Sequence, residues 1–237
     1  PESMQGPAAE LKGVRQGNGV LSIGLLVPIG RPESIYQPAI QAGFELAIAE
    51  INAAGGVLGN PVETHVLDAG DATDGTAVAQ ATEMLGLGVD AIVGPATSAV
   101  AAAILDTVTG AGVTLFSPSN TAAALTEIPD RGLYFRNIAS DALQGDVLAR
   151  LVAEGGNHTA FLIVRNDLYG TGLEAQLRAS LQQLGVAVVG SVVYPLAMDS
   201  FAPISAAVKA ADPDAVVLVS FDEASRLLRS LVVAGLG

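Results

Sequence analysis

The sequence predicts an α/β fold of two successive lobes, each built from a parallel sheet with flanking helices. Short apolar runs of strand length alternate with helical segments, and this alternation restarts after a polar turn near residue 121. The apolar runs are continuous, as is typical of parallel strands that helices cover on both faces. We expect a flexible leader at 1–19, lobe 1 at 20–121 and an incomplete lobe 2 at 122–237.

The first lobe is predicted to contain four strands with three helices between them. Pro38 suits the first turn of a helix, and the run Ala54-Gly55-Gly56 is typical of a helix end. Asp74 is predicted to cap the next helix. The predicted strands are 21–27, 62–67 and two within 89–116, and the predicted helices are 38–52, 74–87 and one between the last two strands.

The second lobe repeats the pattern after a short extended segment at 133–136, which we assign to lobe 2. Asp141 is predicted to cap its first helix, which extends to about residue 153. The further predicted strands are 160–164, 186–194 and 215–219, and the further predicted helices are 172–184, 200–210 and 222–234.

Composition excludes several classes of protein. Half of the 237 residues are hydrophobic and 15% are charged, which favours a large core over disorder. The net charge of −13 argues against nucleic-acid partners and anionic membrane surfaces, since both attract clustered Lys and Arg. The absence of cysteine removes disulfides and thiol chemistry. No apolar run reaches the ~18 residues of a membrane helix.

No cofactor or metal is predicted. The glycine clusters match neither the dinucleotide fingerprint nor the Gly-Lys-Ser/Thr phosphate loop. Asp68, Asp71 and Asp74 are spaced by three, which fits turns and caps better than a calcium loop. His65 and His158 each lack a second histidine at ligand spacing.

A serine-dependent α/β enzyme remains as a less favoured alternative. Ser98 follows a predicted strand and opens a helix, as the nucleophile of such an enzyme would. The nucleophile turn needs Gly-x-Ser-x-Gly, whereas Pro95 to Val100 reads PATSAV. No histidine occupies the late position expected of the base.

Hydroxyl-rich turns follow two predicted strands in the stretch 89–121. Because parallel strands end at the same sheet edge, these turns are expected to lie side by side. Hydroxyls and backbone N–H groups at a helix start suit a small polar ligand, although ordinary helix capping also explains them. A third such loop, predicted in the other lobe, carries Tyr169. The residues of the two hydroxyl-rich turns are Ser98, Ser117, Ser119, Asn120 and Thr121.

Several segments together resemble the periplasmic substrate-binding proteins of branched-chain amino-acid ABC transporters, of the type I periplasmic binding fold. The resemblance extends from about Leu21 to the end of the chain. The matching segments are AGFELAIAEINAAGGVLGNPVE at 42–63, VDAIVGPATSAV at 89–100, GVTLFSPSNTAAALT at 112–126, YFRNIASDALQGDVLA at 134–149 and NDLYGTGLEAQLRASLQQLGV at 166–186.

The resemblance implies two Rossmann-like lobes that close on a ligand without chemistry. By motif position, Ser98, Ser119, Asn120 and Thr121 would hold the α-carboxylate and α-ammonium of an amino acid. Tyr36, Tyr169 and Phe221 would line the side-chain pocket, with Ser220 as the alternative to Phe221. Asn120 departs from the family, in which a small alanine is usual at this position.

The resemblance also implies partners and a location. We expect a monomer that delivers its ligand to ABC transporter permease subunits. It would be periplasmic or extracellular, with its signal peptide removed and a lipid anchor as an open alternative. A sensor domain for amides, urea or aromatic acids is the second functional hypothesis. Family members continue past the position of Gly237 and supply a further acidic ligand residue, so we expect that the C-terminal part of the fold is missing.

Overall fold

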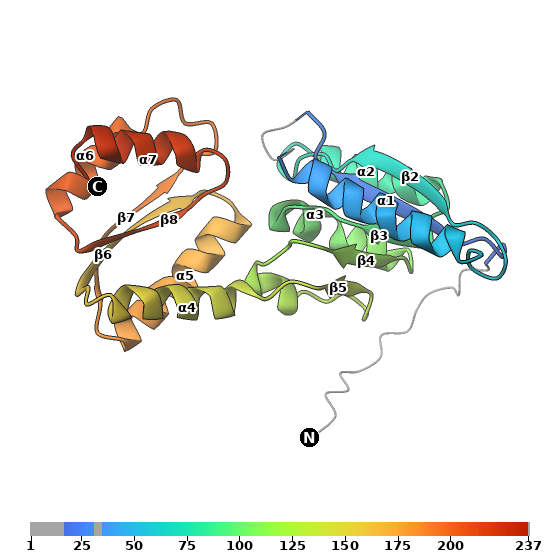
Figure 1. Cartoon of the computed structure of the whole chain (residues 1–237), viewed down its shortest axis with the longest axis horizontal. Coiled ribbons are helices and arrows are strands. Elements are labelled where there is room, and N and C mark those ends of the chain that lie inside the picture. Colours follow the sequence, from blue (N-terminus) through green and yellow to red (C-terminus); the bar gives the residue numbers. More distant parts are fainter. Residues whose placement is uncertain (1–16, 31–34, 237) are drawn as a thin grey trace, which may run out of the picture. The chain divides into compact units, whose positions relative to one another are not determined.

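The computed structural model describes residues 17–30 and 35–236, which form two compact units (Figure 1). The first unit holds the described residues up to 120 together with 127–138, and the second holds 121–126 and 139 onward. Most of the predicted leader lies outside the described residues. No helix in the described ranges combines the length and apolar character needed to cross a membrane.

The first unit is a five-stranded parallel sheet in the order β2-β1-β3-β4-β5. The chain moves outward from β1 to β2 on one side and to β3 on the other, so the strand order reverses at β1. Such a switch point is where open α/β sheets bind ligands, beyond the carboxyl ends of the strands. The strands are β1 (Ser22–Val27), β2 (Glu63–Asp68), β3 (Ala91–Val93), β4 (Thr114–Ser117) and β5 (Tyr134–Arg136), and the helices are α1 (Gln37–Ala53), α2 (Thr76–Gly86) and α3 (Ser98–Gly110).

The second unit is a three-stranded parallel sheet in the order β7-β6-β8, with β6 in the centre. Its strands are β6 (Thr159–Arg165), β7 (Ala187–Tyr194) and β8 (Ala215–Val219). The α-helices are α4 (Asp141–Glu154), α5 (Leu168–Gln183), α6 (Ala202–Ala211) and α7 (Ala224–Val233), and a 3₁₀ turn, η2, spans Ala123–Thr126. The prediction of an α/β fold with parallel sheets and flanking helices is confirmed.

Alternate residues of β6 enter two different cores, one on each face of this sheet. Leu162 and Val164 pack against one core, to which α5 contributes Leu173 and Leu177. Ile163 enters the other core, which is formed with residues of α6 and α7. Figure 1 shows α4 and α5 on one face and α6 and α7 on the other. Burial on both faces explains why β6 reads as an unbroken apolar run.

The boundary between the units differs from the predicted one. The segment 133–136, which we had placed in lobe 2, forms β5 and pairs with β4 in the first sheet. Residues 121–126 instead belong to the second unit. After the polar turn at 117–121, the chain contributes residues 121–126 to the second unit and then returns to the first sheet as β5. Three residues carry too little hydrophobic pattern to indicate which sheet they join.

Helix caps also differ from the predictions. Helix α5 begins at Leu168 rather than 172, because the Asp167 carboxylate accepts the Gly170 N–H at 2.7 Å. Ser140, not Asp141, caps α4, and its Oγ accepts the Ala142 N–H. Gly75 holds the N-cap position of α2, although the preceding Asp74 accepts the Thr76 N–H.

Gly94 gives a test of the switch-point geometry. Its φ of +102° is strained for other residues, and a Cβ there would meet the Leu26 carbonyl oxygen of β1. Gly94→Ala is expected to destabilise the protein by about 2 kcal/mol or more, measured by urea unfolding. Gly43→Ala is the control, because open space surrounds Gly43 within α1. That change should stabilise by about 0.5 kcal/mol. Equal unfolding midpoints for the two variants would contradict the assignment.

Candidate functional site

The turns that follow β3 and β4 lie next to each other at the switch point of the first sheet. Val93 pairs with Phe116, and the Gly94 N–H donates to the Phe116 carbonyl at 2.9 Å. The two strands therefore end together. The turn at 94–97 leads into α3, and the turn that begins at Ser117 leads toward η2.

Hydrogen bonds join these two turns directly. The buried Ser117 hydroxyl donates to the Pro95 carbonyl at 3.3 Å and accepts the N–H groups of Ser119 and Asn120. The Ser119 hydroxyl donates to the Ala96 carbonyl at 2.8 Å. Because the single hydroxyl proton of Ser119 is committed to Ala96, its remaining lone pair suits a donor such as an ammonium group.

Asn120 is fully buried and holds the same two turns together. Its side-chain Nδ2 donates to the Pro95 carbonyl at 3.0 Å, and its Oδ1 accepts the Tyr134 hydroxyl at 3.3 Å. Burial, opposed by the charge of Arg136, raises the pKa of Tyr134 to about 12, so its hydroxyl stays a donor. Both ends of the Asn120 amide are paired within the protein, and this pairing indicates a positioning role.

Ser98 is the first residue of α3 and is buried. Thr97 precedes it in an extended conformation as the N-cap residue. The N–H groups at a helix start and the helix dipole favour an anion at this position. The sequence reasoning therefore placed Ser98 correctly on a strand-turn-helix connection.

The other two residues predicted to lie near the head group have different positions. Thr121 is half-buried and begins the second unit, where its carbonyl accepts the Asp141 N–H at 2.8 Å. Tyr36 is half-buried at the N-cap of α1, at the end of the connection from β1. The structure thus brings Ser119 and Asn120 into contact with the turn that precedes Ser98. It places Thr121 in a separate unit.

Tyr169 and Phe221 come together in the second unit. Their ring centroids are 5.5 Å apart and the ring planes are inclined by 14°, which is a stacked arrangement. Tyr169 lies in the first turn of α5, not in a loop as predicted, and Phe221 lies between β8 and α7. Both residues therefore follow the carboxyl ends of neighbouring parallel strands.

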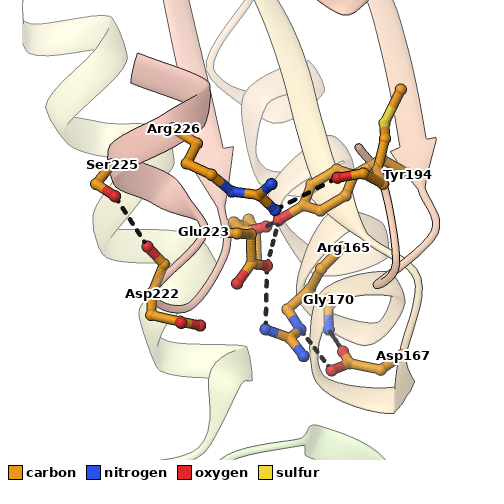
Figure 2. A network of polar contacts seen from close by, with 10 residues as sticks. Arg165, Asp167, Gly170, Tyr194, Asp222, Glu223, Ser225 and Arg226 are labelled. Atoms are coloured by element: carbon orange, nitrogen blue, oxygen red, sulfur yellow. Dashed lines mark hydrogen bonds and ion pairs between the residues drawn. The ribbon is translucent and has the colours of Figure 1, made fainter. Parts of the chain in front are cut away.

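A buried charged cluster beside these rings was not predicted from the sequence (Figure 2). Arg165, the last residue of β6, is 3% exposed. Its Nε lies 2.6 Å from Asp167 Oδ2 and its NH1 lies 3.2 Å from Glu223 Oε1. The Tyr194 hydroxyl donates to the same Glu223 oxygen at 2.7 Å. The guanidinium carbon lies 3.4 Å from the centroid of the Phe221 ring.

The cluster keeps Glu223 ionised and Tyr194 neutral. Burial favours the neutral form of Glu223, but the Tyr194 hydroxyl, main-chain N–H groups and Arg165 outweigh it and lower its pKa. Burial, together with the hydrogen bond to Glu223 and its charge, raises the pKa of Tyr194 well above its usual value. The hydrogen bond from Tyr194 to the ionised Glu223 therefore persists across the neutral pH range.

A sequence signal for this cluster does exist. Arg165 ends one apolar strand, and Glu223 follows the end of the neighbouring one. The edge argument that selected the hydroxyl-rich turns applies equally to charged residues at strand ends. Among the described residues, no group of three or more His, Asp or Glu side chains is arranged to hold a metal ion.

The fold and these two half-sites define a class: α/β proteins of two parallel-sheet units that bind small molecules beyond their strand ends. The chain belongs to the periplasmic binding protein family, whose model matches residues 20–237. The matched family consists of binding proteins and not enzymes, which counts against a serine-dependent enzyme.

Two curated relatives illustrate the match. The chain is 32% identical to the Leu/Ile/Val-binding protein BraC3 of Rhizobium johnstonii, over 88% of this chain and 56% of that protein. It is 33% identical to the leucine-, isoleucine-, valine-, threonine- and alanine-binding protein of Pseudomonas aeruginosa, over 71% of this chain and 45% of that protein. The chain thus spans about half the length of these relatives.

Solved structures show the same fold. The branched-chain amino-acid transporter substrate-binding protein LivJ of Streptococcus pneumoniae, in complex with isoleucine, matches with a TM-score of 0.79 and 29% identity. That match covers 92% of this chain and 62% of LivJ. A solute-binding protein of R. palustris in complex with 4-hydroxybenzoate matches with a TM-score of 0.83 and 19% identity, over 92% of this chain and 59% of that one.

Asn120→Ala tests the positioning role of this residue. The change removes one of the two donors to the Pro95 carbonyl and the amide oxygen that accepts the Tyr134 hydroxyl, so we expect a loss of about 1–3 kcal/mol in the free energy of unfolding. The control is Asn18→Ala, because the Asn18 carbonyl accepts only an exposed local N–H from Val20 among the bonds described. Its expected effect is within about 0.5 kcal/mol. Equal effects in urea unfolding would rule out the role.

Proposed function

We propose that this chain is part of an extracytoplasmic solute-binding protein for an amino acid or a related small polar ligand. The protein would use residues of both lobes and deliver the ligand to a membrane ABC transporter. One observation carries the proposal: the turns after β3 and β4 are cross-linked at the switch point, beside the start of α3. Membership of the periplasmic binding protein family supports it.

The head group of the ligand is assigned to the first of these turns and its neighbours. The N–H groups at the start of α3, with the Ser98 hydroxyl, suit a carboxylate. Thr121 is assigned to the carboxylate by its motif position alone. The Ser119 oxygen suits the ammonium group, because its proton is donated to Ala96. Asn120 holds the turns at the correct separation instead of contacting the ligand through its amide.

The side chain of the ligand is assigned to Tyr36, Tyr169 and Phe221. The stacked pair of Tyr169 and Phe221 offers apolar surface beside a polar hydroxyl. Aromatic surface of this kind suits a branched aliphatic or an aromatic side chain. No covalent step is involved, so binding and release are the whole of the proposed activity.

Membership of the family supports a proposal for the partner and the location. A periplasmic or extracellular protein of this family would present its loaded form to ABC transporter permease subunits. We propose that it acts as a monomer, with a lipid anchor as the alternative to a freely diffusing form. Aromatic carboxylic acids are a second ligand class, favoured by the Tyr169 and Phe221 pair, and would fit a sensor as well as a transporter.

Calorimetry on the protein expressed from its complete gene tests the proposal. The panel is leucine, isoleucine, valine, threonine, alanine, phenylalanine, 4-hydroxybenzoate, acetamide and urea. We expect at least one free amino acid to bind more tightly than acetamide or urea, because the proposed site suits a carboxylate. Binding of 4-hydroxybenzoate alone would favour the second ligand class. No binding of any member would refute both.

Thr121→Ala tests the head-group assignment. Loss of the hydroxyl should weaken carboxylate ligands by about 1–3 kcal/mol in calorimetry, since it removes a hydrogen bond to a charged group. Thr82→Ala is the control, because the Thr82 hydroxyl on the exposed face of α2 only donates to the Val78 carbonyl. Unchanged affinity in Thr121→Ala would contradict the role.

A further inference from the structure

Arg165 is a buried cation, so its charge must be balanced by other groups of the protein. A guanidinium that is 3% exposed costs several kcal/mol of desolvation unless it is paired. Asp167 and Glu223 supply that pairing, at 2.6 Å and 3.2 Å. Both carboxylates are engaged elsewhere as well, since Asp167 caps α5 through Gly170 and Glu223 accepts from Tyr194. The cluster is therefore satisfied internally, and no free charge in it is left for a ligand.

The position of the cluster is fixed by the ends of all three strands of the second sheet. Arg165 ends β6, Tyr194 ends β7 and Glu223 follows β8. The Asn166 N–H donates to the Tyr194 carbonyl at 2.9 Å and extends the pairing of β6 with β7. Figure 2 shows the Tyr194 hydrogen bond and the Arg165 ion pair meeting at Glu223. The guanidinium is thus held at the ends of the strands of this sheet.

Phe221, by contrast, belongs to the short connection from β8 to α7. Its backbone carbonyl accepts the Ala224 N–H, and its own N–H is hydrogen-bonded to the Glu223 carboxylate. Its ring lies against the Arg165 guanidinium, 3.4 Å from the centroid, and stacks on Tyr169. A planar guanidinium stacks on an aromatic face with a favourable cation–π energy. Arg165 therefore contacts the Phe221 ring directly and also pairs with the carboxylate that holds the Phe221 backbone.

We propose that Arg165 is a positioning residue that determines ligand specificity, by fixing the Phe221 ring against Tyr169 as a rigid wall for the ligand side chain. This inference rests on the proposed function for its consequence in binding. A ligand side chain that contacts the wall gains affinity only when the two rings are already in place, because ordering them on binding costs free energy. A ligand without such a side chain is unaffected.

The test uses the protein expressed from its complete gene and three changes in the cluster. Arg165→Lys keeps the positive charge but replaces the planar guanidinium, which stacks on an aromatic ring, with an ammonium group. Arg165→Met removes the charge, and Arg165→Met combined with Glu223→Gln removes it without changing the net charge, while Asp167 keeps its bond from the Gly170 N–H. Arg226→Met is the matched control, because Arg226 is exposed and lies 5.3 Å from the centroid of a different ring, Phe201. Thermal unfolding of each variant checks that it is folded.

The first readout needs no ligand. Stacking on Phe221 should shift the NMR signals of the Tyr169 ring protons upfield, with Tyr169→Phe providing the assignment. We expect this shift to diminish in all three Arg165 variants and to persist in Arg226→Met. Persistence of the shift in the charge-balanced double variant would overturn the inference. This result is independent of the calorimetric panel, so it separates the inference from the proposed function.

The second readout is the ratio of leucine to alanine affinity. Loss of the fixed wall in Arg165→Lys should weaken leucine binding by about tenfold, which corresponds to the energy of a single cation–π contact with its ordered ring. Alanine binding should weaken by less than about twofold. A general loss of structure would weaken both equally. Equal weakening of the two amino acids in a folded variant would therefore overturn the inference. If the wild-type protein binds neither leucine nor alanine, the ring shift alone decides.

Discussion

Parallel main-chain pairing of β1 with β3 and of β3 with β4 is the constraint on which the candidate site depends. It ends the strands at the same level, so that two turns distant by about twenty residues can exchange hydrogen bonds. The close approach of Gly94 to the Leu26 carbonyl shows how little space this pairing leaves. Ser117 and Asn120 then fix the turns with buried hydrogen bonds beside the start of α3.

The strand ends of the second unit are also joined by side chains, but through charged groups. Its strand ends are joined by a buried ion cluster, in which Arg165 pairs with Asp167 and Glu223. A guanidinium can make two ion pairs and one ring contact at once, which an ammonium group cannot do in a fixed plane.

The two units offer different chemistry at their strand ends. The polar turns of the first unit suit a head group that all amino acids share, whereas the aromatic pair of the second unit suits a variable side chain. The chain spans about half the length of its curated relatives, so its assignment to a transport system remains a proposal.

The sequence by itself determined the α/β class, the order of strands and helices, and the polar turns after β3 and β4, because these depend on local periodicity and composition. Only the tertiary structure decided that β5 joins the first sheet, since a three-residue strand is assigned by its pairing partner. It also decided that Asn120 is buried and that Arg165 meets Glu223 across 58 positions of sequence. Such contacts depend on which strands become neighbours in the sheet, and the sequence pattern alone does not contain that information. The sequence predicted that the turns within 89–121 lie at a polar edge of the sheet. The pairing of the strands then decided which hydrogen bonds fix those turns.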